Sequence, residues 1–357
     1  MFKFKFDRKI KNGYYTASYF KKTIHIIKKY QPRNEVVMQF THFHKSPVKV
    51  CGIEESVALL KASIKTKDWK QIKIYGKQDG DIVENAQPVL LIVGPYEIFG
   101  TFENIIDGIL ARRSSVCNNC DQMLKLITPQ QLIYMADRTD DYLVQPYDGY
   151  AAYVGGVRHF VTDASIELIK NKKNIDVTGT IPHALIQQYD GNLNLAMQDY
   201  IKEYGAKNAV ALIDYHNDVQ SEIKLLSKDF NNLFAVRVDT SANLIDEGLV
   251  RTIKDARNNM KLYGVSPELI KLTRKVLDES GFKQTKIIAS SGIDVAKIKT
   301  YQIAKAPVDY YGVGSSLITR NIHFTADLVI KNGKAQAKTG RKLFMNINNI
   351  EKLHSYH

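Results

Sequence analysis

The sequence lacks the features of a disulfide-stabilised, membrane-spanning or repetitive protein. Its three cysteines are an odd number and form no disulfide framework, which favours a cytoplasmic location. No apolar run approaches the roughly 18 residues that cross a bilayer, so no membrane partner is expected. No internal repeat of about 20–50 residues is present, which excludes a solenoid. The alternation of phenylalanine and charge in residues 1–9 predicts a strand rather than a signal peptide.

Acidic residues are scarce at both ends of the chain. The net charge of +13 is concentrated in residues 1–30, with nine Lys/Arg against one acid, and in residues 331–357, with six against one. Many nucleic-acid-binding proteins are basic. These two segments, however, have neither zinc-ligand spacing nor a helix-turn-helix pattern. We therefore interpret them as a solvated, lysine-rich surface and expect no nucleic-acid partner.

The first third of the chain is typical of a small sheet with helices. At 357 residues the chain has room for one large α/β domain and a smaller one. Apolar side chains recur on one helical face from about residue 97 to Arg113, and a further helix is expected over Ser56–Ile64. Short apolar runs between glycine-rich turns predict strands at Val36–Phe40, Ile72–Tyr75 and Val89–Val93.

After residue 205 strands and helices alternate regularly. Between them, Ser266 is the expected N-cap of a helix that begins at Pro267 and ends before Gly281. Such alternation predicts a parallel sheet, whose ligands bind at the carboxyl ends of the strands. The predicted strands are Asn208–Ile213, Leu233–Val238, Lys286–Ala289 and Asp309–Gly312.

A β-hairpin follows the alternating region. The segments Ala326–Ile330 and Ala335–Lys338 flank Asn332-Gly333, and Asn-Gly is a strong signal for a two-residue hairpin turn. We expect this hairpin to rejoin the first sheet, so that the smaller domain is discontinuous in sequence.

Polar or small residues follow each strand of the predicted parallel sheet. Asp214 follows the first strand, and Arg237 and Asp239 share one face of the second. Ser290-Ser291-Gly292 and Gly312–Ser316 follow the other two, and small residues let backbone N–H groups approach phosphate oxygens. The structural alternatives are a helix cap, a salt bridge and ordinary turns. Because such residues recur at every strand end, we favour a ligand site.

The segment Gly179-Thr180-Ile181-Pro182-His183 places an imidazole after a Gly-Thr turn and a proline. Proline suits the first turn of a helix, so His183 is expected near a helix N-terminus, where the dipole favours anions. A histidine beside a phosphate can carry a proton, donate a hydrogen bond or accept a phosphoryl group. The alternative is simply a capped helix start.

Cys117 and Cys120 have the spacing of half a zinc site. No second pair of ligands completes the four that a tetrahedral site needs, so we interpret them as structural thiols on a helix and expect no protein metal site. The charged stretch 137–141 is interpreted as a solvated loop.

Taken in chain order, these motifs resemble the nicotinate phosphoribosyltransferases, a family of type II phosphoribosyltransferases. Ala17 stands where the family has Asp in its Asp-x-Tyr segment, and Met135 where it has the Phe of Phe-Gly-x-Arg. The resembling segments are Thr16–Phe20, Glu103–Val116, Met135–Arg138, Asp148–Gly156, Gly179–Leu185, Val236–Thr240, Ser290–Asp294, Tyr311–Leu317 and Asp327–Lys334.

The resemblance implies a fold and a reaction. The fold is an irregular, TIM-like α/β barrel over residues 111–317, with a smaller discontinuous α/β domain over residues 1–110 plus 318–357. The reaction joins nicotinate to phosphoribosyl pyrophosphate, giving nicotinate mononucleotide and pyrophosphate in NAD biosynthesis or salvage. It is usually coupled to hydrolysis of ATP, with Mg²⁺ on the leaving pyrophosphate. The resemblance also implies a homodimer whose active sites are shared between subunits.

The same resemblance assigns roles to individual residues. His183 would be phosphorylated by ATP, and Asp214 or Asp239 would stabilise positive charge on the sugar or hold its hydroxyls. Tyr19 of the partner subunit would stack on the ring, and Arg138 would pair with phosphate or carboxylate. Thr180 would contact base or ribose, and Arg237 would bind sugar and phosphate. The 5′-phosphate cradle would consist of Ser291, Gly292, Gly314 and Ser315.

Three alternative functions stay open. Nicotinamide-using relatives carry an aspartate near Thr162 and Asp163, and a shift of one residue decides which of the two faces the ring. We expect nicotinate, because the Thr162 hydroxyl can donate to a carboxylate and Arg138 supplies charge. Quinolinate is disfavoured because no basic cluster suits a dicarboxylate. From another class, the chain could be a catalytically silent, nucleotide-binding regulatory barrel.

Overall fold

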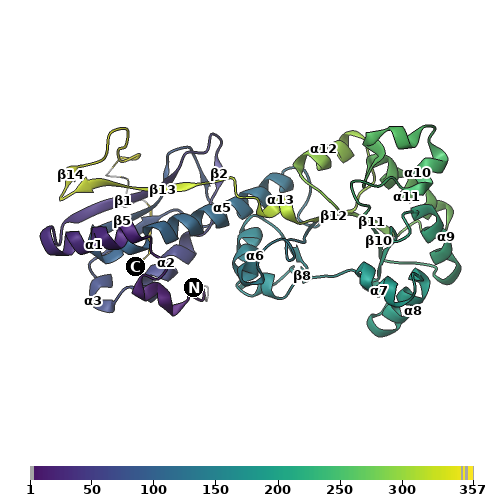
Figure 1. The fold of residues 1–357 in the computed structure, drawn as a ribbon, viewed down its shortest axis with the longest axis horizontal. Coiled ribbons are helices and arrows are strands. Elements are labelled where there is room, and N and C mark those ends of the chain that lie inside the picture. The colour runs from purple at the N-terminus through teal and green to yellow at the C-terminus, as the bar shows by residue number, and fades with distance from the viewer. Residues whose placement is uncertain (1–3, 347–348, 350–352, 357) are drawn as a thin grey trace.

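Two large sheets divide the molecule into two parts that lie end to end (Figure 1). The computed structural model describes residues 4–346, 349 and 353–356. A six-stranded sheet forms the part at the left of Figure 1, and a seven-stranded sheet forms the part at the right. A separate two-stranded sheet pairs β2 (Val48–Lys49) with β4 (Ile82–Val83).

The six-stranded sheet is antiparallel and has the strand order β14-β13-β1-β5-β3-β15. All three strands predicted before residue 100 occur, as β1, β3 and β5. The hairpin prediction is also confirmed, because β13 pairs with β1 and both residues of the Asn332-Gly333 turn have positive φ. The strands are β1 (Glu35–His42), β3 (Lys73–Gly76), β5 (Pro88–Pro95), β13 (Phe324–Lys331), β14 (Lys334–Ala335) and β15 (His354–Ser355).

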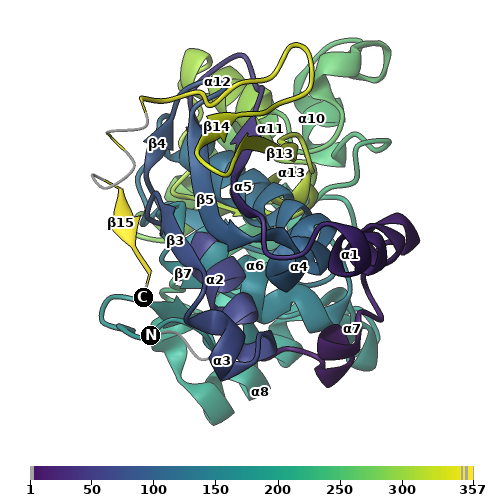
Figure 2. The same ribbon diagram turned by 90° about the vertical axis from the view of Figure 1, so that its left-hand side faces the viewer.

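Helix α5 (Glu103–Leu124) connects the cores of the two parts. Its first half buries Ile106 and Leu110 against the six-stranded sheet, and its second half buries Cys117 and Cys120 in the other core. The helix was expected to end near Arg113; it continues because its last turns are covered by apolar neighbours. Both thiols are free and buried, as a structural role requires. Figure 2 views this part from the left-hand side of Figure 1. Its other helices are α1 (Ser18–Tyr30), α2 (Ile53–Ser63), α3 (Thr66–Trp69) and α4 (Tyr96–Phe99).

The strand predicted at the N-terminus is wrong for the described residues 4–9. Phe4 instead packs on helix α6, with its ring 6.3 Å from the Tyr147 ring and 5.6 Å from the Tyr150 ring. The Tyr147 hydroxyl donates to the carbonyl of Lys5, and Asp7 caps a short 3₁₀ helix. Tertiary aromatic contacts therefore override the alternating pattern. Residues 1–3 lie outside the described residues.

The seven-stranded sheet is parallel and has the strand order β8-β7-β6-β12-β11-β10-β9. Each of the four strands predicted after residue 205 occurs, as β9, β10, β11 and β12. The strands are β6 (Leu132–Tyr134), β7 (His159–Phe160), β8 (Asp176–Val177), β9 (Val210–Leu212), β10 (Ala235–Val238), β11 (Lys286–Ala289) and β12 (Tyr310–Val313).

This sheet curls but is not a closed barrel in the described residues. Its edge strands β8 and β9 do not pair with each other, so the TIM-like closure expected from the resemblance is not seen. Strand β8 is two residues long and exposed, which leaves few backbone groups to bond across the gap. The observed architecture is a mixed α/β fold with a curled, open parallel sheet and a separate antiparallel sheet.

Helices cover the outer face of the parallel sheet (Figure 1). Helix α11 begins as predicted: the Ser266 hydroxyl accepts from the Leu269 N–H, and Pro267 is the first helical residue. No helix in the described part of the chain is both long and apolar enough to cross a membrane. The helices are α6 (Gln145–Val154), α7 (His183–Gln188), α8 (Leu193–Tyr204), α9 (Val219–Asp229), α10 (Glu247–Thr252), α11 (Pro267–Glu279), α12 (Val295–Ile303) and α13 (Ser315–Ile318).

A buried ion cluster joins α5 to α6 and α2. The Asp148 carboxylate, whose side chain is 3% exposed, accepts from Arg112 at 2.6 Å and from Arg113 at 2.8 Å. Arg113 also donates to Glu55 at 2.8 Å. Arg112 reaches further, to the carboxylate of Asp140 at 2.6 Å. The cluster therefore ties both cores to the loop that follows β6.

Candidate active site

A hydrogen-bonded row of side chains lies at the carboxyl ends of β10 and β11. Arg237 donates to the Thr180 hydroxyl and, at 2.8 Å, to the Asp239 carboxylate. The other oxygen of Asp239 accepts from the Ser290 hydroxyl at 2.6 Å. The Nε of Arg237 is buried and has no hydrogen-bond partner in the described part of the chain. A buried donor without a partner is what a bound oxygen-rich ligand would satisfy.

His183 lies beside Asp214. Its Nε2 is 3.3 Å from both carboxylate oxygens, and its side chain is 40% exposed while that of Asp214 is 7% exposed. Burial raises the pKa of Asp214, the imidazole opposes that shift, and the nearby Asp239 carboxylate adds to it. Pro182 is the N-cap of α7 rather than a first-turn residue, and His183 is the first helical residue. The carboxylate, more than the six-residue helix, thus fixes the imidazole.

The two Gly/Ser segments follow β11 and β12 as predicted. Ser291 and Gly292 both have positive φ, at 70° and 63°, a backbone shape that exposes N–H groups in a turn. Lys297 of α12 donates to the Ser291 carbonyl at 2.9 Å, and burial lowers the pKa of its ammonium group. Gly314 is the N-cap of α13, in which Ser315 is the first residue.

The loop after β6 lies against the start of α13. A Cβ on Gly314 would be 3.0 Å from the Met135 carbonyl oxygen, so a larger residue there would push the two segments apart by a few tenths of an ångström. Arg138 in this loop is exposed, and the described residues offer it no ion pair. The loop is held by Gln145, whose amide donates to the Asp137 carbonyl at 3.0 Å.

The Thr162 hydroxyl is already engaged. It donates to the Gln145 side-chain oxygen at 3.1 Å and lies within 3.2 Å of the Ser165 N–H and 2.9 Å of the Ser165 hydroxyl. A hydroxyl has one proton to donate, so Thr162 has none left for a substrate carboxylate. Asp163 is exposed. In this geometry neither Thr162 nor Asp163 is placed to distinguish a carboxylate from an amide on the substrate ring.

Tyr19 is not near these residues in the same chain. It lies on α1, with its side chain in contact with Phe20 and 61% exposed. Figure 1 shows α1 and α7 at opposite ends of the molecule. The chain therefore brings together Thr180, His183, Asp214, Arg237 and Asp239 but leaves Tyr19 remote.

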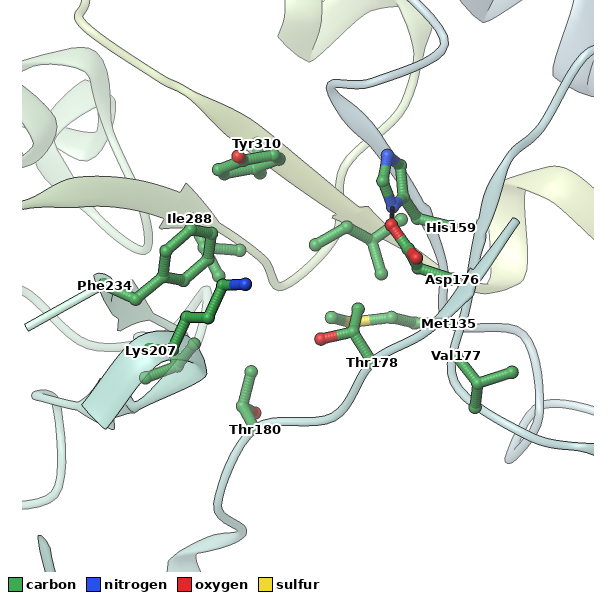
Figure 3. A pocket seen from close by; sticks show the side chains of 12 residues that line it. Met135, His159, Asp176, Val177, Thr178, Thr180, Lys207, Phe234, Ile288 and Tyr310 are labelled. Carbon is green, nitrogen blue, oxygen red and sulfur yellow. Dashed lines mark ion pairs between the residues drawn. The ribbon is translucent and has the colours of Figure 1, made fainter. Parts of the chain in front are cut away.

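A cavity of about 420 Å³ lies inside the curled sheet (Figure 3), where Lys207, Phe234 and Tyr310 line it at the amino ends of β9, β10 and β12. Thr180 belongs to both the row and the cavity. The Met135 side chain lies inside, where a Cβ on Gly312 would come within 2.7 Å of its sulfur. A volume of this size suits a small ligand. The lining residues are Ile133, Met135, His159, Asp176, Val177, Thr178, Thr180, Lys207, Val210, Phe234, Ile288 and Tyr310.

Several residues of this region were missed by sequence reasoning. Ser290, Lys297 and Gln145 act on the predicted residues from a distance in sequence, and Lys207 precedes β9 without any motif. Only the Ser290 position carried a signal, as part of a noted Ser-Ser-Gly turn. The described residues contain no group of three or more potential metal ligands among His, Cys, Asp and Glu.

Comparison with known proteins identifies relatives among phosphoribosyltransferases. The N-terminal domain family of quinolinate phosphoribosyl transferase matches residues 18–114. The chain is 25% identical over 252 residues to nicotinate phosphoribosyltransferase of Bacillus subtilis, which covers 69% of this chain and 45% of that protein. The chain thus spans about half the length of this curated relative.

Solved structures share the fold. The nicotinate-nucleotide pyrophosphorylase of Pyrococcus furiosus superimposes with a TM-score of 0.77 at 25% identity, covering 96% of this chain and 81% of that one. Human nicotinic acid phosphoribosyltransferase superimposes with a TM-score of 0.67 at 13% identity, covering 90% and 76%. The expected fold relationship is therefore confirmed.

Proposed function

We propose that this chain, a relative of the nicotinate phosphoribosyltransferases, transfers phosphoribosyl from phosphoribosyl pyrophosphate to nicotinate in NAD biosynthesis. The observation that carries the proposal is the row from Thr180 through Arg237 and Asp239, which lies at the carboxyl ends of parallel strands. In parallel α/β folds, this is the end at which ligands bind.

The pyridine nitrogen needs no base, because its lone pair is free to attack the ribosyl carbon. The task of the protein is therefore to orient the ring and to stabilise the positive charge that develops on the sugar. Asp239 is held on both oxygens, by Arg237 and Ser290, so its carboxylate is fixed in position for this charge or for ribose hydroxyls. The Arg237 guanidinium is the kind of donor that pairs with phosphate oxygens.

We propose that the 5′-phosphate binds the turns at Ser291-Gly292 and Gly314-Ser315. Both turns follow strands of the same sheet, on either side of the β11–β12 pair. Mg²⁺ fits this site as a pyrophosphate-bound ion, since Asp214 and Asp239 supply the one or two carboxylates it commonly uses together with substrate phosphates. It would neutralise the charge of the leaving pyrophosphate.

We also propose that ATP phosphorylates His183. Asp214 accepts from Nε2, which leaves the lone pair of Nδ1 to attack the γ-phosphorus of ATP with ADP as the leaving group. Asp214 then stabilises the imidazolium character that develops as the N–P bond forms, as a carboxylate does for a catalytic histidine.

The active site is proposed to need two chains of a cytoplasmic homodimer. Tyr19 lies on α1, in the part of the molecule away from the row, so in this proposal a second copy of the chain supplies the tyrosine that stacks on the ring. Mixing inactive Tyr19→Ala and Asp239→Ala subunits should regenerate active sites that combine one intact copy of each residue. If subunit exchange is demonstrated and no activity returns, the shared site is refuted.

Quinolinate is the second candidate base, because the matched family is named for it. A dicarboxylate requires two cationic partners, and the described row offers one, Arg237, which is already paired with Asp239. The deciding experiment incubates the protein with phosphoribosyl pyrophosphate and nicotinate, nicotinamide or quinolinate, each with and without ATP. Formation of mononucleotide from nicotinate supports the proposal, and formation from quinolinate with release of CO₂ replaces it. No product from any base would favour the silent regulatory barrel.

A further inference from the structure

A groove lined by six basic side chains lies in the part of the molecule that carries the six-stranded sheet. Its volume is about 770 Å³, and residues of α1, α3, α4 and the 3₁₀ helix Arg8–Asn12 line it. Asp68 and Glu97 also line this basic groove, which leaves it a net charge of +4. Figure 1 shows α1 and α3 at the opposite end of the molecule from β10 and β11. The basic side chains are Lys11, Lys21, Lys28, Arg33, Lys65 and Lys67.

Separate segments of the fold bring these charges together. Lys21 and Lys28 are seven residues apart on α1, so they lie about two turns apart on one face, with the buried Ile24 between them. A Cβ on Gly13 would be 3.5 Å from the Lys21 Cε, so the Lys21 side chain lies over the turn that ends the 3₁₀ helix. The 3₁₀ helix itself, the turn after α1 and the start of α3 supply the other cations.

The carboxylates of the basic groove do not pair with its cations. None of the six basic side chains forms an ion pair with a carboxylate of the described residues. Glu97 instead accepts from the backbone N–H of Arg33 at 2.7 Å, and its other oxygen is buried. Asp68 accepts from the side-chain amide of Gln71 at 3.4 Å. Like charges gathered in this way repel one another, so an anion bound between them would stabilise the folded state.

We propose that the basic groove binds a small ligand that carries two or more phosphate groups. Its volume lies in the range of small-molecule sites, and its concave shape lets several cations reach one ligand. Charge-assisted contacts from lysine and arginine are the usual means of holding phosphate oxygens. The phosphates belong either to a nucleoside polyphosphate or to a free polyphosphate chain. In the first case, the side chains of Ile98 and Phe102 offer apolar surface to the nucleoside.

The basic groove is separate from the proposed phosphoribosyl site. Tyr19 is exposed on α1 but does not line the groove, because residues two apart on a helix point about 160° away from each other. Phe102, the aromatic residue among the described lining residues, is 6% exposed. The groove therefore lacks the exposed aromatic surface on which single-stranded nucleic acid stacks. A small anion fits these features better than a nucleic-acid strand.

Calorimetric titration with inorganic tripolyphosphate, and separately with ATP, tests the basic groove. The test variant is Lys21→Gln/Lys28→Gln. The matched control is Lys22→Gln/Lys29→Gln, which removes the same charge from the same helix at positions that do not line the groove. All four side chains are exposed, so both variants should fold. Loss of two charged contacts should weaken tripolyphosphate binding about 10-fold in the test variant and less than about 2-fold in the control.

A second readout locates the ligand, because the row is also proposed to bind phosphates. Acetylation of lysines, mapped by mass spectrometry, should slow at Lys21, Lys28 and Lys65 when tripolyphosphate is present. Lys22 and Lys29 should react at the same rate with and without it. Tighter binding of ATP than of tripolyphosphate would support the groove as a nucleotide site, and equal affinity would support it as a site for the phosphate chain alone.

Several results would overturn the proposal. Equal loss of affinity in the two double variants would show a response to net charge alone. Absence of binding of both probes, or protection confined to lysines outside the groove, would also exclude the site. If a single-stranded oligonucleotide binds in a way that depends on Lys21 and Lys28 while tripolyphosphate does not bind, a nucleic-acid surface replaces it. None of these results depends on formation of mononucleotide, so the proposed function stands or fails separately.

Discussion

Neutralising Asp148 should strongly destabilise the protein, because this carboxylate balances two buried guanidinium groups. Arg112 and Arg113 are 14% and 9% exposed in their side chains, and both donate to Asp148. Asp148→Asn preserves the shape but removes the charge and replaces one acceptor oxygen by an NH2 donor, which faces the guanidinium donors. Removing one partner of a buried ion pair costs about 3–5 kcal/mol.

The lower end of that range is expected here. Arg113 keeps Glu55 and Arg112 keeps Asp140 as remaining partners, so neither cation is left alone. A loss of about 3 kcal/mol corresponds to a fall in Tm of about 4 °C, because an unfolding entropy of about 2.1 cal/mol/K per residue over 357 residues gives about 1.3 °C per kcal/mol. Differential scanning calorimetry at pH 7 measures this shift.

The control is Glu279→Gln, which removes an exposed ion pair on α11. Lys275 and Glu279 are 3.8 Å apart with side chains 71% and 58% exposed, so their contribution is screened by solvent. We expect a change in Tm of no more than about 1 °C for this variant. If Asp148→Asn lowers the Tm no more than the Glu279→Gln control does, the view that the buried cluster holds the two cores together is refuted.

Three further predictions follow from single contacts. Labelled ATP should leave an acid-labile phosphoryl group on the wild type but not on His183→Ala; equal labelling of both would exclude this histidine as the acceptor. Lys297→Met should raise KM for phosphoribosyl pyrophosphate about 10-fold with little change in kcat, because the Ser291 carbonyl loses a charged donor; Lys297→Arg should recover most of this, and Lys299→Met, on the exposed side of α12, should match the wild type. Burial, with a smaller contribution from a neighbouring carboxylate, raises the pKa of Asp107 to about 7. The folded state therefore retains a proton that the unfolded state releases near pH 4, so stability falls as pH rises from about 4 to 7. Asp107→Asn should be more thermostable than the wild type at pH 8 and similar to it at pH 4; a lower Tm at pH 8 would contradict this.

Sequence patterns predicted the elements whose determinants are local. The N-cap at Ser266, the Asn332-Gly333 turn and the strands β9 to β12 depend on residues within a few positions of each other, and all occur. The placement of Asp214 and Asp239 at strand ends follows from the same patterns, because parallel strands align their carboxyl ends. Local periodicity and capping were sufficient for these features.

Features that depend on distant partners were decided only by the tertiary structure. The N-terminal phenylalanines alternate as in a strand, yet Phe4 packs on α6 because two tyrosine rings lie there. Thr162 looks like a free donor in the sequence, but its hydroxyl donates a hydrogen bond to the Gln145 side-chain oxygen, 17 residues away. The sheet stays open because β8 is too short to reach β9 with a ladder.

Lys207 shows the same limit at the amino ends of the parallel strands. Nothing in its sequence neighbourhood separates it from the many other lysines of this basic chain. Its distinction is positional: it precedes β9 at the edge of the open sheet, and its ammonium group is directed into the cavity. The alternation of strands and helices determined which end of the sheet carries the polar row. Which charges remain unbalanced inside the sheet was decided by contacts between residues far apart in the chain, because ion pairing is a long-range property of the folded structure.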